Sequence, residues 1–166
     1  GRGRDYGVEL MKDRGTGERG VTMLEVMITI AVLLVLAAAA LPVARTAIKR
    51  QRELELRSAL REMRNAVDMY KKYFDQGLLP PEGLESEGYP KDLETLVEGV
   101  NQVGAIDKKV RFLRRVPKDP MTNTYDWGLR SLQDDPNSLS WGRQNLYDVY
   151  TTSEGVGLDG TAYNTW

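Results

Sequence analysis

The order of hydrophobic and polar positions divides the chain into parts of different character. Residues 1–20 are polar, glycine-rich and of mixed charge, so we expect a leader that buries little surface, with Met11 a candidate initiator inside it. From Val26 to Ala44 no charged side chain occurs. About 19 helical residues at ~1.5 Å each come close to crossing a ~30 Å hydrocarbon layer. The pattern predicts a transmembrane helical segment over residues 21–44, with a secretory signal peptide as the alternative.

Beyond Pro42 the apolar residues recur with the spacing of an amphipathic helix. Charged side chains, Glu53 among them, lie largely off the line of apolar positions, which recur at steps of mostly three and four. These apolar positions are Ala47, Leu56, Leu60, Met63, Val67, Tyr70 and Phe74. A proline inside a helix bends or stops it, so we predict one long kinked helix whose amphipathic half covers residues 45–76. Gly77, followed by prolines at 80 and 81, predicts its end near residue 75.

Residues 77–166 have a different composition, rich in glycine, proline, asparagine and aspartate with aromatic residues between them, which is typical of short elements joined by turns. We expect a short helix over residues 90–97, begun at the proline, and either a strand or a helical turn over 110–116. Alternation over 125–129 and 147–150 predicts half-buried strands. So small a domain makes a marginal core alone, so it should pack on the amphipathic stripe. The expected fold class is α+β.

Composition excludes several kinds of chemistry. The chain has no cysteine and no histidine, which removes disulfides, thiol catalysis, thiolate or imidazole metal sites and histidine acid–base chemistry. Lysine and arginine number 23 against 24 acidic residues, so no basic bias toward nucleic acid exists. An enzyme is the least favoured class, because no nucleophile–base group is recognisable. Any metal must be held by oxygen.

One acidic residue interrupts the apolar run. Glu25 stands five residues after Gly20, and a carboxylate in hydrocarbon is disfavoured by about 2.5 to 3.5 kcal/mol, so we expect it to have a partner and a role. The stretch Gly20-Val21-Thr22-Met23-Leu24-Glu25-Val26 resembles the class III signal of type IV pilins and pseudopilins, in which a glycine precedes the cleavage and a glutamate stands fifth after it. Pro42, the twenty-second residue counted from Val21, also falls where that family has a proline.

A second stretch narrows the resemblance. It is similar to the segment that marks the major pseudopilin, the G-type, of type II secretion systems: Phe112-Leu113-Arg114-Arg115-Val116-Pro117-Lys118-Asp119-Pro120, then Asn123 and Tyr125. Residues 147–150 and 158–160 and the final Trp166 resemble that family's C-terminus, so the resemblance covers about residues 20–166. We expect Lys118 and Asp119 to be turn and salt-bridge residues of the globular part, or else a contact between subunits.

The resemblance implies a maturation step. Residues 1–20 would be removed by a prepilin peptidase that cuts between Gly20 and Val21, and the new amine would be N-methylated. Such an amine has a pKa of about 8 and is mostly charged at neutral pH. Glu25 of a neighbouring subunit is its expected partner; the alternative is that Glu25 snorkels to the head-group layer. Pro42 is expected to let the helix loosen on assembly, or else to be a static kink.

The resemblance also implies a role and a location. The chain would be a structural subunit that forms a homo-polymer, a periplasmic filament of a type II secretion system that helps to export folded proteins. Its partners would be the prepilin peptidase/N-methyltransferase, minor pseudopilins and an inner-membrane assembly platform. It would cross the inner membrane once, with the C-terminal domain in the periplasm. The alternatives are a type IV pilin of a surface filament for adhesion, motility or DNA uptake, and a membrane-anchored module that binds calcium or another ligand.

Two departures from the family bear on this interpretation. Pilins often close a C-terminal loop with a disulfide, which this chain cannot form, and that favours a pseudopilin over an adhesive pilin. Major pseudopilins tend to carry an aspartate-rich calcium loop near the end, whereas residues 153–164 hold only Glu154 and Asp159 as carboxylates. Calcium takes roughly six to eight oxygens, some of which backbone carbonyls and waters can supply. Asp159 is therefore the candidate ligand and calcium the candidate cofactor; the alternative is a tight turn at Asp159-Gly160 with no ion.

Overall fold

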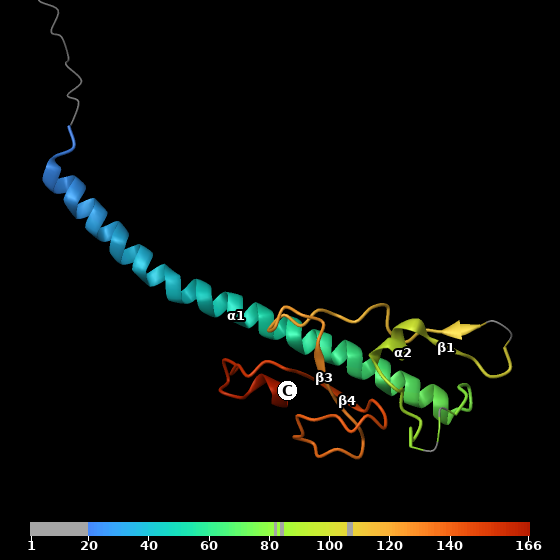
Figure 1. Ribbon diagram of the computed structural model, residues 1–166. Helices are drawn as coiled ribbons and strands as arrows, with labels where there is room; N and C mark the ends of the chain where they lie inside the picture. Colours follow the sequence, from blue (N-terminus) through green and yellow to red (C-terminus); the bar gives the residue numbers. More distant parts are fainter. Residues whose placement is uncertain (1–19, 82, 84, 106–107) are drawn as a thin grey trace, which may run out of the picture. The chain divides into compact units, whose positions relative to one another are not determined.

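The computed structural model describes residues 20–81, 83, 85–105 and 108–166. Figure 1 follows the elements in chain order. They are α1 (Met23–Asp75), α2 (Leu93–Glu98), β1 (Val100–Asn101), β2 (Lys109–Val110), β3 (Trp127–Arg130), β4 (Asp148–Thr151) and the 3₁₀ turn η1 (Tyr163–Thr165). Two compact units divide the chain, residues 1–42 and residues 43–166, and α1 contributes to both.

Helix α1 continues through Pro42, as its periodicity predicts, and ends at Asp75. Its end is a Schellman motif, in which the N–H of Gly77 donates to the carbonyl of Phe74 at 2.8 Å and the N–H of Leu78 donates to that of Tyr73 at 3.0 Å. Gly77 has a φ of 72°, a left-handed conformation that glycine adopts without a steric penalty. The glycine signal thus ends the helix at the predicted place.

Two of the expected short elements are corrected. Helix α2 begins at Leu93 rather than at Pro90, because Asp92 caps it: the Asp92 Oδ1 accepts the backbone N–H of Thr95 at 2.8 Å. Over residues 110–116 the strand β2 reaches only Val110, and neither a longer strand nor a helical turn follows. The N–H groups of residues 112 and 113 both donate to the carbonyl of Leu96, at the end of α2, so they are not available to a sheet.

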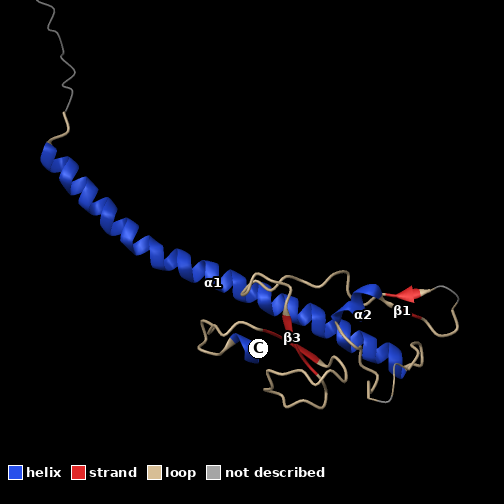
Figure 2. Ribbon diagram, in the orientation of Figure 1, coloured by secondary structure: helices blue, strands red, loops and turns tan. Residues whose placement is uncertain are grey.

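Both strands expected from alternation are present, but each begins later than predicted and is buried along most of its length rather than half-buried. β3 pairs with β4 in an antiparallel ladder that sets Trp127 opposite Thr151 and Gly128 opposite Tyr150. A Cβ on Gly128 would lie 2.2 Å from the ring of Tyr150, so only glycine fits against this aromatic side chain. β1 and β2 form a second two-stranded antiparallel sheet. Figure 2 shows that loops make up most of the chain that follows α1.

The core of the unit formed by residues 43–166 is built on one stripe of α1. The stripe side chains buried there are Leu56, Leu60, Met63, Val67 and Tyr70. They pack against buried side chains from the C-terminal segments, among them Leu79, Leu96, Leu113, Trp127, Leu146, Val149 and Tyr163. Each fully buried large apolar side chain contributes about 1.5 to 3 kcal/mol, which is how the small domain gains a sufficient core. The α+β fold is confirmed, with one correction: Ala47 is exposed, so the buried stripe begins later than the pattern predicts.

Candidate functional site

The N-terminus of α1 is organised by Thr22. Its Oγ1 accepts the backbone N–H of Glu25 at 3.2 Å, and its carbonyl accepts the N–H of Val26 at 3.1 Å. Thr22 is therefore the N-cap, and the helix begins at Met23 rather than at residue 21. The sequence analysis missed this role, although Thr22-x-x-Glu25 is a capping-box pattern. The carboxylate of Glu25 lies in the first turn, where the helix dipole stabilises a negative charge.

The helical surface around Glu25 is apolar and uncovered. Met23 is 81% exposed and Leu24 is 67% exposed, and the described side chains from Val21 to Ile48 are all exposed. Among the described residues, α1 is the one helix long and apolar enough to cross a membrane. An apolar surface of this extent requires lipid or neighbouring protein to cover it. Among the described residues, none covers the apolar helical surface around Glu25.

Pro42 lies inside α1 and is exposed. Because proline has no backbone N–H, it cannot supply the helical hydrogen bond to the carbonyl of Ala38. The α-helix is nevertheless continuous on both sides of it. A loosening of the helix at this position during assembly, or a kink, stays a prediction.

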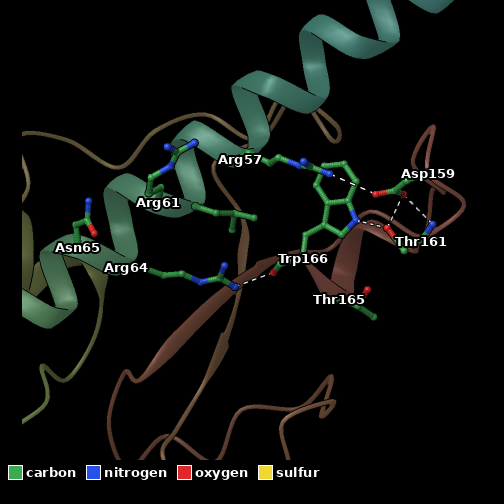
Figure 3. A pocket seen from close by; sticks show the side chains of 9 residues that line it. Arg57, Arg61, Arg64, Asn65, Asp159, Thr161, Thr165 and Trp166 are labelled. Atoms are coloured by element: carbon green, nitrogen blue, oxygen red, sulfur yellow. Dashed lines mark hydrogen bonds and ion pairs between the residues drawn. The ribbon is translucent and has the colours of Figure 1, made fainter.

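The carboxylate of Asp159, the candidate calcium ligand, is engaged by side chains of its own domain. Its Oδ1 accepts the N–H of Thr161 at 2.9 Å and the hydroxyl of Thr161 at 2.6 Å, and its Oδ2 lies 3.3 Å from Nη2 of Arg57 on α1. The hydrogen bonds from Thr161, with a smaller contribution from Arg57, hold the pKa of Asp159 below its ordinary value. Figure 3 shows Arg57, Asp159, Thr161 and Trp166 around one groove beside α1.

Glu53 holds the loop that contains Asp159. The sequence pattern placed Glu53 wrongly, off the line of buried positions. It is 9% exposed, and its Oε1 accepts the N–H of Leu158 at 2.8 Å and the hydroxyl of Tyr163 at 2.9 Å. The signal was its position: Glu53 stands three residues before Leu56 and so falls on the buried stripe rather than off it. A buried carboxylate needs such donors, and the C-terminal loop supplies them.

A second group of charges ties β4 and the final residue to α1. Arg64 Nε lies 2.6 Å from Asp148 Oδ1, and Arg64 Nη2 donates to the carbonyls of Val149 at 3.1 Å and Trp166 at 2.7 Å. Arg130, which is buried, reaches the other oxygen of Asp148 at 3.4 Å and stacks over the ring of Tyr150. One carboxylate thus serves two arginines, which satisfies charges that would be costly to bury singly.

Asp119, in the segment 112–125, is fully buried. Its Oδ1 accepts the N–H of Met121 at 2.8 Å, and its Oδ2 accepts the hydroxyl of Thr151 on β4. Among the described residues no ion pair involves it, so the expected salt bridge is wrong and neutral donors hold the carboxylate instead. Asp119 therefore positions this segment against β4 from inside the domain.

Comparison with known proteins assigns the family. Residues 16–41 match the family model described as the prokaryotic N-terminal methylation motif. Over 113 residues the chain is 30% identical to type II secretion system core protein G of Escherichia coli strain K12, an alignment that covers 65% of this chain and 70% of that protein. The chain belongs to the core protein G family. No solved structure matches it.

Membership in the core protein G family confirms the resemblance to the type II secretion pseudopilins. The methylation motif contains Gly20, Val21 and Glu25 and stops one residue before Pro42. The individual roles of these residues in processing and assembly stay predictions. What the structure adds is their setting: an exposed segment outside regular secondary structure, a threonine cap and an uncovered apolar helix.

Tyr163 leads us to expect a loss of stability at alkaline pH. Burial, helped by the neighbouring Glu53, raises the pKa of Tyr163 from 10.0 to about 12. Because the folded pKa lies above the unfolded one, the neutral phenol stabilises the fold fully below a pH of about 10, and this contribution is lost as the pH rises to about 12. The free energy of unfolding, from denaturant melts of the detergent-solubilised chain, should fall over this range.

The matched control is Tyr163→Phe, which removes the titrating group. Most of the alkaline slope should disappear in this variant, leaving the part due to Tyr89, whose pKa is also raised by burial. An equal slope in the two proteins would contradict the assignment to Tyr163.

Proposed function

We propose that this chain is the major structural subunit of a type II secretion pseudopilus, cut between Gly20 and Val21 by a prepilin peptidase and polymerised into a periplasmic filament that helps to export folded proteins. The observation that carries the proposal is the methylation motif, which falls on the capped and exposed start of an uncovered apolar helix. The relative in Escherichia coli is a core protein of such a secretion system by name.

The setting of the cleavage position supports processing. Gly20 and Val21 precede the helix and are exposed, and Gly20 has no neighbouring heavy atom within 4 Å of where a Cβ would stand. A peptidase needs backbone that is outside regular structure and accessible. Because Thr22 caps the helix one residue after the cut, cleavage leaves the cap and α1 intact.

The cap also favours the pairing role of Glu25. Thr22 bonds the backbone N–H of Glu25 and not its carboxylate, so the carboxylate of one subunit remains available to the amine of Val21 on the next. N-methylation keeps the charge on that amine. In a low-dielectric filament core, an amine and a carboxylate that are each costly alone neutralise each other, and the pair selects the register of neighbouring helices.

The remaining partners follow from the same proposal. Before assembly, the subunits would be single-pass proteins of the inner membrane with residues 77–166 in the periplasm. The helices would then bundle in the filament with the domains outside, and burial of their uncovered apolar faces would drive assembly. The peptidase/N-methyltransferase, the minor pseudopilins and the inner-membrane platform would act in turn, powered by an ATPase that this chain does not contain.

The mass of the membrane-extracted protein tests the proposal. After expression with a prepilin peptidase, we expect a chain that starts at Val21 and carries one added methyl group. Gly20→Lys should stay uncut, because the side chain obstructs the position before the cleavage, whereas Gly17→Ala in the same leader should be processed normally. An uncut wild-type N-terminus under these conditions would instead support a simple membrane anchor.

A further inference from the structure

Two charged side chains of α1 attach the C-terminal loop, residues 153–166, to the helix within the unit formed by residues 43–166. Glu53 holds it through Leu158 and Tyr163, and Arg57, one turn later on the same helix, holds it through Asp159. In the family to which this chain belongs, the corresponding loop is expected to carry calcium. Whether a calcium ion fits depends on which oxygen atoms of this loop are free to bind it.

The carboxylates of the loop do not suit a calcium ion. Calcium takes roughly six to eight oxygen ligands, of which acidic side chains are the strongest. Asp159 has both oxygens committed, one to Thr161 and the other to Arg57, and Glu154 is exposed. Among the described residues, which include the whole loop, no group of three acidic side chains gathers.

Several backbone oxygens of the loop are also engaged. The carbonyl of Gly155 accepts the N–H of Tyr163 at 3.0 Å, that of Gly157 accepts the N–H of Gly160 at 3.1 Å, and that of Thr161 accepts the N–H of Gly157 at 2.8 Å. The loop therefore closes on itself by hydrogen bonds. An ion would have to replace several of these bonds to acquire a coordination shell.

Arg57 supplies a positive charge at this place. Its guanidinium carbon lies 4.2 Å from the centre of the Trp166 ring, and Nη2 lies 3.3 Å from Asp159 Oδ2. The Trp166 Nε1 donates to the hydroxyl of Thr161 at 2.6 Å, and that hydroxyl donates to Asp159 Oδ1. These contacts form a closed cycle that includes the guanidinium, and a divalent cation beside Asp159 would be repelled by its positive charge. Figure 3 shows this arrangement.

We propose that Arg57, together with Glu53, fastens the C-terminal loop to α1 in place of a metal ion, so that this domain folds and keeps its loop without calcium. On this proposal Asp159 is the partner of Arg57 rather than a calcium ligand. The proposal does not depend on the filament function, because it concerns the stability of the domain in a single chain.

Calcium addition gives the first test. We would follow thermal unfolding of the full detergent-solubilised chain by tryptophan fluorescence in EDTA, in MgCl₂ and in CaCl₂. Calcium at about 100 times its Kd would raise the melting temperature by roughly 10 °C in a domain of this size. We expect the three melting temperatures to agree within about 1 °C at ~5 mM cation, a range well below that effect. A rise specific to calcium would overturn the proposal.

Arg57 gives the second test, with Arg61 as its matched control. Arg61 lies one turn further along α1, lines the same groove and has no hydrogen bond or ion pair among the described residues. Arg57 and Asp159 are each about half exposed, with 53% and 47% of their side chains accessible, so the loss should be moderate. We expect Arg57→Gln to lower the melting temperature by about 2 to 5 °C and Arg61→Gln to leave it unchanged. Equal melting temperatures for the two variants would overturn the role of Arg57.

Discussion

Replacing Glu25 with alanine should abolish filament assembly and leave membrane insertion intact. Insertion should not suffer, because the change removes a carboxylate that is disfavoured in hydrocarbon by about 2.5 to 3.5 kcal/mol. Assembly should fail, because each subunit would then bring a charged amine into the filament core without a partner. An unpaired buried charge costs about 3 to 5 kcal/mol, and in a polymer that cost recurs at every subunit.

The experiment needs two measurements on the same cells. Carbonate extraction reports insertion, and electron microscopy with quantification of sheared filaments reports assembly. Glu55→Ala is the matched control: it is an exposed glutamate on the same helix, beyond the apolar run, hydrogen bonded to Gln51. We expect filament yield near that of the wild type for Glu55→Ala and none for Glu25→Ala. A normal filament yield from Glu25→Ala would contradict the proposed role of Glu25 in assembly.

Asp119→Ala should lower the free energy of unfolding by about 2 to 5 kcal/mol. The substitution leaves the N–H of Met121 and the hydroxyl of Thr151 without their acceptor in a fully buried place. Each buried polar group left unsatisfied costs about 1 to 3 kcal/mol. Asp119→Asn retains an acceptor oxygen and should lose less. Urea denaturation of the detergent-solubilised chain, followed by circular dichroism, measures all three proteins.

The control for this series is Asp126→Ala, which changes an exposed aspartate of the same loop region. Surface substitutions of this kind usually stay within about 0.5 kcal/mol of the wild type. If Asp119→Ala and Asp126→Ala were equally stable, the carboxylate of Asp119 would not be the organising contact of this segment. Because the domain carries no part of the methylation motif, this result would leave the proposed processing step unaffected.

The sequence predicted those parts of the fold whose signal is local. The apolar period specified α1 because a stripe of side chains three and four residues apart must face a core, and Gly77 specified its end. Alternation located β3 and β4 approximately, but not their burial, because both strands are buried at nearly every position. Residues 110–116 were misjudged because their backbone donors are taken by Leu96 of α2, a partner that a linear pattern does not reveal.

The residues of the methylation motif were easier to predict from the sequence than the residues of α1 that hold the C-terminal loop. Gly20, Val21 and Glu25 could be named because the signal is a contiguous motif. The position of Glu53 three residues before Leu56 placed it on the buried stripe, but its role could not be predicted. A buried carboxylate is tolerated only when it has donors, and here Leu158 and Tyr163 supply them from far along the chain. A similar distance along the chain separates Arg57 from Asp159, so a local pattern did not reveal the contact between them.

The contact between Glu53 and Tyr163 joins positions 110 residues apart. Closing so long a segment costs conformational entropy and slows folding, and the contact cannot form until the chain has been synthesised as far as residue 163. Until then the stripe of α1 lacks part of its cover, and the nascent domain exposes surface that favours aggregation. Folding of the domain would therefore set the earliest moment at which a newly inserted subunit becomes competent to join others.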